Sequence, residues 1–265
     1  MNKPQGQPLV REQLYEALKD YRDAAKVLVT FFERLSEFAQ EFEKKKQAAA
    51  QQLQQFGETL AQLSHAARQL PQLSKDALAT LANQGWYITS TMPMKSLLHL
   101  ASEVLEGNTK NVDDIMIDLV DETITDDCQT ICHRYSDRAK IISSAVDAYH
   151  AGKYELCVPI FIIQADGICA EKTGIGLYKK LRGPGARALK DYVDTNATET
   201  FHSILAEPLR IVPPLIFSDK QRQDTPVDLN RNAILHGENK SYDTKVNAAK
   251  TFTLLSSTSW FLNYI

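Results

Sequence analysis

One apolar seam runs through the first part of this sequence and constrains its fold more than any other feature. From Leu14 to Leu70, apolar residues recur at alternating intervals of four and three positions, and only Lys46 breaks the pattern. The seam consists of Leu14, Leu18, Tyr21, Ala25, Leu28, Phe32, Leu35, Ala39, Phe42, Lys46, Ala49, Leu53, Phe56, Leu60, Leu63, Ala67 and Leu70. The stretch has no proline and a single glycine, Gly57. It predicts a coiled-coil-like helix, either unbroken or folded back near Lys44 to Lys46, and this helix must pack against a partner.

The residues after the seam also favour helices. Pro71 is expected to end the first element, because proline lacks the backbone N–H that a helix interior needs. Two shorter helices are predicted at Leu73 to Ala82, stopped by Gly85, and at Met94 to Leu105, stopped by Gly107.

The second half of the chain has the pattern of a helical bundle. Helices are predicted at Arg138 to His150, Tyr154 to Ala170, Ala186 to Leu209, Pro226 to His236 and Thr244 to Tyr264. The short connection at Gly152 makes the first two an antiparallel pair. Thr225 and Asp243 are the expected N-caps of the last two helices, and Gly237 is the expected stop of the penultimate one. No strand pattern competes, so the predicted fold class is all-α.

An acidic segment separates the two halves. Between Lys110 and Arg134 there is no Lys or Arg, and the carboxylates are Asp113, Asp114, Asp118, Asp121, Glu122, Asp126 and Asp127. The segment fits a solvated helix face, and it also fits a cover over a basic loop elsewhere in the chain. We place the domain boundary just after it, near residue 130. The prediction is a helical coiled-coil, regulatory or dimerisation region at 1–130 and a catalytic helical bundle at 131–265.

Charge and composition limit the classes of function. Lys and Arg total 30 against 33 for Asp and Glu, and the net charge of -3 excludes the overall basicity of a non-specific nucleic-acid binder. Any nucleic-acid site must therefore be local. The N-terminus lacks an apolar signal core, and the longest apolar run, Val158 to Ile163, is too short to span a membrane. We expect a cytoplasmic protein with no membrane partner.

The predicted penultimate helix carries Arg231, Asn232 and His236. On a helix Asn232 and His236 share a face, whereas Arg231 and His236 diverge by roughly 140°. His236 lies at the helix C-terminus, where the protonated imidazole is favoured, and this suits proton transfer near neutral pH. Arg231 lies on the apolar side, where a guanidinium needs an anion such as phosphate. RNA transesterification needs a general acid or base and a fixed positive charge, which His236 and Arg231 would supply. A surface Arg and a helix-capping His would show the same spacing.

The motif Arg231-Asn232-x-x-x-His236 resembles the catalytic motif of HEPN ribonucleases. The likeness extends to the preceding stretch RAKIISSAVDAYHAGKYELCVPIFIIQADGICAE, which is similar to the helical hairpin before the motif in bacterial HEPN proteins, and to NRNAILHG followed by Tyr242. It covers roughly residues 134 to 265. The sequence departs from many HEPN toxins in having Glu238, not tyrosine, two residues after the histidine.

The resemblance implies an activity and partners. Arg231, Asn232 and His236 would cut RNA without a metal or another cofactor and leave a 2',3'-cyclic phosphate, often at a composite site across a homodimer. Members of this kind commonly act as toxins or as effectors of antiviral defence, so an antitoxin or a sensor protein is an expected partner.

A basic segment is the second feature that could contact RNA. Between Lys172 and Lys190 the chain has no acid, and Lys179, Lys180, Arg182 and Arg187 surround the turn Gly183-Pro184-Gly185. The segment fits an RNA-backbone contact or a solvated loop. Asp166 and Glu171 lie just before it and are candidate orienters of Arg231 or His236, with helix-capping and surface roles as the alternative.

Two of the four cysteines stand near a histidine, as metal ligands often do. Cys128, Cys132 and His133 resemble half of a zinc site, but no second ligand pair follows at a suitable spacing, so we predict no metal and reduced thiols. The alternative function is a non-catalytic helical scaffold that binds RNA or protein, because a fold does not by itself confer activity.

Overall fold

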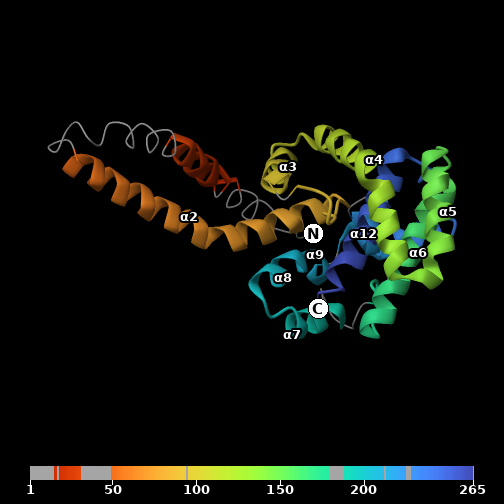
Figure 1. The fold of residues 1–265 in the computed structure, drawn as a ribbon. Coiled ribbons are helices and arrows are strands. Elements are labelled where there is room, and N and C mark those ends of the chain that lie inside the picture. The colour runs from red at the N-terminus through yellow and green to blue at the C-terminus, as the bar shows by residue number, and fades with distance from the viewer. Residues whose placement is uncertain are drawn as a thin grey trace. The chain divides into compact units, whose positions relative to one another are not determined.

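Helices form every regular element in the part of the chain that the computed structural model describes, and this confirms the all-α class. The described residues are 15–16, 18–30, 49–93, 95–179, 188–211, 213–224 and 228–264. They fall into two compact units, Met1–Asp76 and Ala77–Ile265 (Figure 1). Within the described ranges, no helix combines the length and the apolar character that crossing a membrane would require.

The first unit contains the helix at 18–30 and most of α2 (Ala49–Asn83). Residues Asp20, Tyr21 and Ala24 line one shallow groove together with Ala61 and His65, so the two helices lie side by side (Figure 1). This is the folded-back layout, not one unbroken helix. The proposed turn at Lys44 to Lys46 lies outside the described residues.

The apolar seam is only partly covered by other side chains. Leu18 is buried, but Phe56, Leu60 and Leu70 are exposed along α2. That these exposed residues pack against a partner helix as in a coiled coil therefore stays a prediction.

Pro71 does not end the helix, and this prediction was wrong. α2 continues through Pro71 to Asn83 and ends where Gly85 adopts a positive φ of 85°. Proline removes one backbone hydrogen bond from a helix interior, but packing can outweigh that loss. Here the last turns of α2 bring Ala77, Leu78 and Leu81 into the core of the second unit.

The second unit begins with α3 (Lys95–Leu105), α4 (Thr109–Arg134), the 3-10 turn η1 (Ser136–Arg138), α5 (Ala139–His150) and α6 (Tyr154–Thr173). The helices predicted around α3, α5 and α6 are confirmed. The boundary that we expected near residue 130 falls inside α4, which packs against α5 and α12 and contributes Cys128 and Ile131 to the core. The structure divides the chain between Asp76 and Ala77 instead.

The long helix expected at Ala186 to Leu209 is broken into three. They are α7 (Ala188–Asn196), α8 (Thr200–Leu205) and α9 (Glu207–Arg210). Asn196 turns its side-chain amide back to the carbonyl of Tyr192, Glu199 is extended, and Pro208 has no N–H to continue a helix. These local features override the apolar periodicity.

The chain ends with η2 (Pro214–Ile216), α10 (Asp219–Asp224), α11 (Arg231–Leu235) and α12 (Lys245–Phe261). The predicted start of the penultimate helix at Pro226 was wrong, because α11 begins at Arg231; Thr225 and Pro226 lie outside the described residues. Thr244, not Asp243, caps α12, and its hydroxyl accepts a hydrogen bond from the backbone N–H of Asn247.

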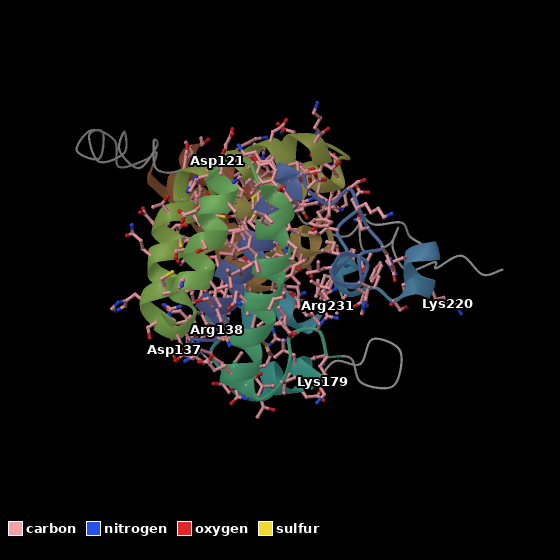
Figure 2. All side chains as sticks on the ribbon, turned by 90° about the vertical axis from the view of Figure 1, so that its right-hand side faces the viewer. Asp121, Asp137, Arg138, Lys179, Lys220 and Arg231 are labelled. Atoms are coloured by element: carbon pink, nitrogen blue, oxygen red, sulfur yellow. The ribbon has the colours of Figure 1, made fainter. Side chains whose placement is uncertain are left out.

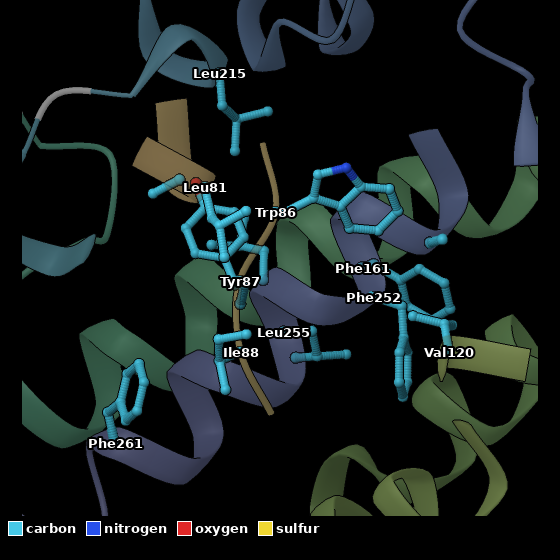
Figure 3. Close-up of a cluster of buried hydrophobic side chains, with 14 of the residues drawn as sticks. Leu81, Trp86, Tyr87, Ile88, Val120, Phe161, Leu215, Phe252, Leu255 and Phe261 are labelled. Atoms are coloured by element: carbon cyan, nitrogen blue, oxygen red, sulfur yellow. The ribbon is translucent and has the colours of Figure 1, made fainter. Parts of the chain in front are cut away.

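Helix α12 is the centre of the second unit. From Asn247 to Ser259 all but Lys250 are buried, and the helix packs against α6 and α4. Phe252 meets Phe161 of α6 edge to face, with ring centroids 5.4 Å apart. Figure 3 shows these rings together with Trp86 and Leu255 in the same cluster. A helix surrounded on all sides fixes the positions of the elements around it.

Two acidic residues of α4 form hydrogen bonds and ion pairs with residues around this core, so the acidic segment is not only a solvated helix face. Asp113 accepts a hydrogen bond from the indole N–H of Trp86 at 2.7 Å and pairs with Lys250 at 3.2 Å. Asp121 accepts from the Tyr149 hydroxyl at 2.7 Å and pairs with Lys245. The acidic segment thus joins α4 to α5 and α12.

Candidate active site

The candidate site is built on α11, a helix of one and a half turns with strong caps. Asn230 at its start is fully buried, and its side-chain oxygen accepts from the N–H of Ala233 at 3.1 Å. The amide of Asn230 also donates to the carbonyls of Pro214 and Phe217. After the helix Gly237 has a positive φ of 74°, which suits a residue without Cβ. These contacts fix both ends of the segment that carries the motif.

Arg231 is half-buried and has no carboxylate partner among the described residues. One of its terminal nitrogens donates to the side-chain oxygen of Asn232 at 2.8 Å. Its guanidinium carbon lies 5.4 Å from the ring centroid of Tyr178, a cation–π distance. Its Nε is buried without a hydrogen-bond partner. The guanidinium is thus held in place while part of its donor capacity stays unused.

Asn232 and His236 complete the motif on the same helix. Asn232 is half-buried, and its backbone carbonyl accepts from the N–H of His236 at 3.0 Å. His236 is the C-cap of α11 and is exposed. Within the described part of the chain its imidazole makes no hydrogen bond or ion pair, so it is accessible to a ligand. Arg231 is thus half-buried, whereas His236 is exposed.

Asp166 and Arg231 both act electrostatically on Tyr178, and the two do not form an ion pair. Asp166 is on α6, against which α11 packs, and its Oδ1 is buried without a hydrogen-bond partner. Burial raises the pKa of Tyr178 well above its ordinary value; the negative charge of Asp166 adds to this and the positive charge of Arg231 opposes it. The Tyr178 hydroxyl donates to the carbonyl of Ile162, one turn before Asp166. Tyr178 therefore contacts the guanidinium of Arg231 through its ring and α6 through its hydroxyl.

Gly176 makes room for this arrangement. A Cβ at position 176 would lie 3.1 Å from Oδ1 of Asp166, which is tighter than ordinary contact. The sequence reading missed Tyr178 and Gly176, because loop contacts do not follow helical periodicity. It could have found Asn230, which is a favoured cap residue directly before the motif.

Of the cations expected to contact RNA, only Lys179 lies within the described residues; it is exposed. Lys180, Arg182 and Arg187 lie outside them. In the view of Figure 2, Lys179, Lys220 and Arg231 lie in the lower right part of the picture, and Asp121 lies at the upper left.

Other predicted candidates have structural partners. Glu171 accepts two hydrogen bonds from Arg138 at 3.2 Å. Glu238 pairs with Arg222 at 2.8 Å, and the hydroxyl of Tyr242 donates to the carbonyl of Glu155. Across the described ranges, no three or more His, Cys, Asp or Glu side chains gather in a way that could hold a metal ion.

Comparison with protein families, with curated proteins and with solved structures gave no match to this chain. The case for a function therefore rests on the residues of α11 and on their surroundings.

Proposed function

We propose that this chain is a metal-independent endoribonuclease of the HEPN type. The observation that carries the proposal is the state of Arg231: its guanidinium is held by Asn232 and Tyr178 and is not neutralised by a carboxylate among the described residues. An exposed imidazole, His236, lies on the same short helix. A fixed cation and an accessible proton carrier are what phosphodiester transesterification needs.

In the proposed reaction the 2'-oxygen of the RNA attacks the adjacent phosphorus. The bond from phosphorus to the 5'-oxygen breaks, and the product carries a 2',3'-cyclic phosphate. His236 takes the proton of the 2'-hydroxyl or delivers one to the leaving 5'-oxygen, and Arg231 stabilises the charge that builds up on the phosphorane oxygens. Asn232 fixes the direction of the guanidinium through their 2.8 Å hydrogen bond.

Asp166 and Tyr178 have supporting roles in this proposal. Oδ1 of Asp166 is a buried acceptor without a hydrogen-bond partner, and Nε of Arg231 is a buried donor without one. Both residues act electrostatically on Tyr178. A water molecule or the substrate could join them. Lys179, with Lys180, Arg182 and Arg187, would contact the RNA backbone, because a chain of net charge -3 needs a local basic region for this purpose.

The biological setting that we propose is a bacterial toxin or an antiviral-defence effector. It acts as a homodimer, with the N-terminal helices as a dimerisation or sensing region and with an antitoxin or sensor protein as the regulator. The exposed seam residues Phe56, Leu60 and Leu70 support a role in assembly, because large apolar side chains in a row favour a partner helix.

The direct test is incubation of the full chain with an RNA oligonucleotide and with a DNA oligonucleotide of the same sequence, both in a chelator. We expect cleavage of the RNA alone, with fragments whose 3'-ends are lighter by one water than a linear phosphate. Cleavage that requires added magnesium or zinc, or fragments that end in a free 3'-hydroxyl, would refute the proposed chemistry.

A further inference from the structure

Two thiols on α4 are in contact. The Sγ atoms of Cys128 and Cys132 lie 3.8 Å apart, one helical turn from each other. The other two cysteines, Cys157 and Cys169, are both on α6 and are fully buried. Among the four cysteines of the chain, Cys128 and Cys132 thus form the one pair whose sulfur atoms touch.

The two thiols differ in exposure. Cys132 is half-buried, and its thiol also lies 3.6 Å from the carbonyl of Ala139, to which it donates at the start of α5. Cys128 is buried; burial, and then the neighbouring Cys132, raises its pKa to about 12. Cys132 is therefore the more exposed thiol of the pair, and Cys128 is its buried partner.

We propose that Cys128 and Cys132 form a modification site that a peroxide converts into a reversible intrahelical disulfide. In the first step the sulfur of Cys132 attacks one oxygen of hydrogen peroxide and the O–O bond breaks. Cys132 becomes a sulfenic acid, and the other hydroxyl group leaves with the proton of the thiol as water. In the second step the sulfur of Cys128 attacks the sulfenic sulfur, its proton leaves with the hydroxyl group as a second water, and the S–S bond forms. The peroxide is reduced and the two thiols are oxidised.

An undistorted α-helix does not allow this bond. The β-carbons of residues four apart on a helix lie about 5 to 6 Å apart, whereas a disulfide needs about 3.5 to 4.5 Å. The sulfur atoms must approach from 3.8 Å to about 2.05 Å, so the bond requires α4 to unwind locally near its end at Arg134 and releases the contact of Cys132 with Ala139. Strained disulfides are more easily reduced, so the site should reopen with a thiol reductant.

The test is a count of free thiols in the full chain before and after treatment with hydrogen peroxide. The chain is then denatured and alkylated, and its tryptic peptides are weighed. We expect the alkylated thiols to fall from four to two, with Cys157 and Cys169 still alkylated. The peptide covering residues 111–134 should lose two hydrogen atoms and take up no alkylating group. Dithiothreitol should restore all four thiols.

Two variants separate the roles of the thiols. In Cys128→Ser the sulfenic acid of Cys132 should persist and react with dimedone, whereas Cys132→Ser should lose no thiol at the same peroxide dose. Oxidation of all four cysteines at one rate, a disulfide between two chains, or four intact thiols after treatment of the folded wild-type chain would each overturn the proposal. These readouts do not use RNA cleavage, so their result is independent of the proposed nuclease function.

Discussion

Arg231 owes its position to two neighbours of different kinds. The side-chain oxygen of Asn232 accepts a hydrogen bond from one of the terminal nitrogens of Arg231. The guanidinium carbon lies 5.4 Å from the centroid of the Tyr178 ring. A ring and an amide can hold a guanidinium without cancelling its charge, whereas a carboxylate would weaken its attraction for phosphate. We infer that Tyr178 is a positioning residue for Arg231 and does not itself touch the substrate.

The role of Tyr178 can be separated from a general effect on packing. Tyr178→Leu should lower kcat/KM for RNA cleavage by about tenfold, because a cation–π contact is worth about 0.5 to 2 kcal/mol. Tyr178→Phe keeps the ring and should stay close to the wild-type rate. Both variants should remain folded at the assay temperature, as urea unfolding would show. A Tyr178→Phe chain that loses as much kcat/KM as Tyr178→Leu would contradict a role of the ring in holding Arg231.

At the scale of the element, α11 depends on its caps more than on its length. A helix this short has few internal hydrogen bonds, and nucleation is costly, so Asn230 supplies much of what keeps it folded. The same side chain joins α11 to the loop that contains Pro214 and Phe217. The cap therefore positions Arg231 and His236 relative to the bundle.

Asn230→Ala should disturb the site as well as the fold. It removes an N-cap, worth about 0.5 to 2 kcal/mol, and takes the Asn230 donor from the carbonyl of Phe217, at about 1 to 3 kcal/mol. The carbonyl of Pro214 still accepts from the N–H of Phe217. We expect a loss of at least about 2 kcal/mol in the free energy of unfolding, measured in urea, and a lower cleavage rate at temperatures where the variant is still folded. Asn230→Asp keeps the cap acceptor but turns a carboxylate oxygen towards the carbonyls of Pro214 and Phe217 at a buried position, so it should also lose stability. An Asn230→Ala chain of wild-type stability would contradict this account.

Asp127 on α4 makes stability depend on pH. Its carboxylate is buried, and Thr89, Ser256 and Thr91 donate hydrogen bonds to it. Burial raises its pKa above the ordinary value of 3.8, in spite of these hydroxyls. The folded state thus holds the proton of Asp127 more tightly than the unfolded state does. The stability that this preference contributes is fully present below the ordinary pKa and is lost as pH rises through the pKa of Asp127 in the folded state.

Asp127→Asn removes the titration while it keeps the shape of the side chain. The unfolding free energy of the variant, relative to wild type, should therefore increase with pH from about pH 3 towards neutrality. The measurement is urea unfolding of both chains at several pH values. Asp126→Asn, an exposed neighbour, is the matched control and should show a smaller change. A difference between Asp127→Asn and wild type that is the same at every pH would contradict the raised pKa.

The sequence predicted the existence of most helices, but not their ends. The apolar spacing in α5 and α6 gave the correct elements, because burial of one face sets the period of the pattern. The breaks inside 186–209 and the start of α11 depend on single side chains, such as Asn196 and Asn230, that bond to the backbone. Periodicity cannot detect these bonds.

The candidate site was predictable to a similar extent. Arg231, Asn232 and His236 stand close together in the sequence, so their shared helix followed from spacing. Asp166 was a sequence candidate, whereas Tyr178 contacts Arg231 only because the loop after α6 folds back to α11, which packs on α6. Contacts of this kind between distant segments need the folded chain.

At the scale of the whole molecule, the proposed nuclease requires a second copy. Arg231 and His236 point about 140° apart on one helix, so one phosphate meets both most easily where two such helices face each other across a two-fold axis. We propose the apolar seam of the N-terminal unit, where Phe56, Leu60 and Leu70 are exposed, as a further surface for pairing. The full chain is therefore expected to be a dimer at micromolar concentration.

Mixing inactive chains tests whether the site is shared. Full-length Arg231→Ala and His236→Ala chains are each expected to be inactive, and mixed dimers should regain part of the activity because one of their two sites has both groups. Dimer formation is followed by light scattering and by a tag on one chain. Mixed dimers that form without any recovery would indicate that each site is built within one chain, and a monomeric wild-type chain would refute the pairing itself.

Single-turnover cleavage rates in a chelator show whether Arg231 and His236 carry out RNA cleavage. His236→Ala should lower the rate by about 10² to 10⁴-fold through loss of proton transfer. Arg231→Lys should also fail, because an ammonium does not reproduce the fork of a guanidinium. Both variants should unfold at the wild-type urea concentration. A folded variant of either residue that cleaves RNA at the wild-type rate would contradict the account.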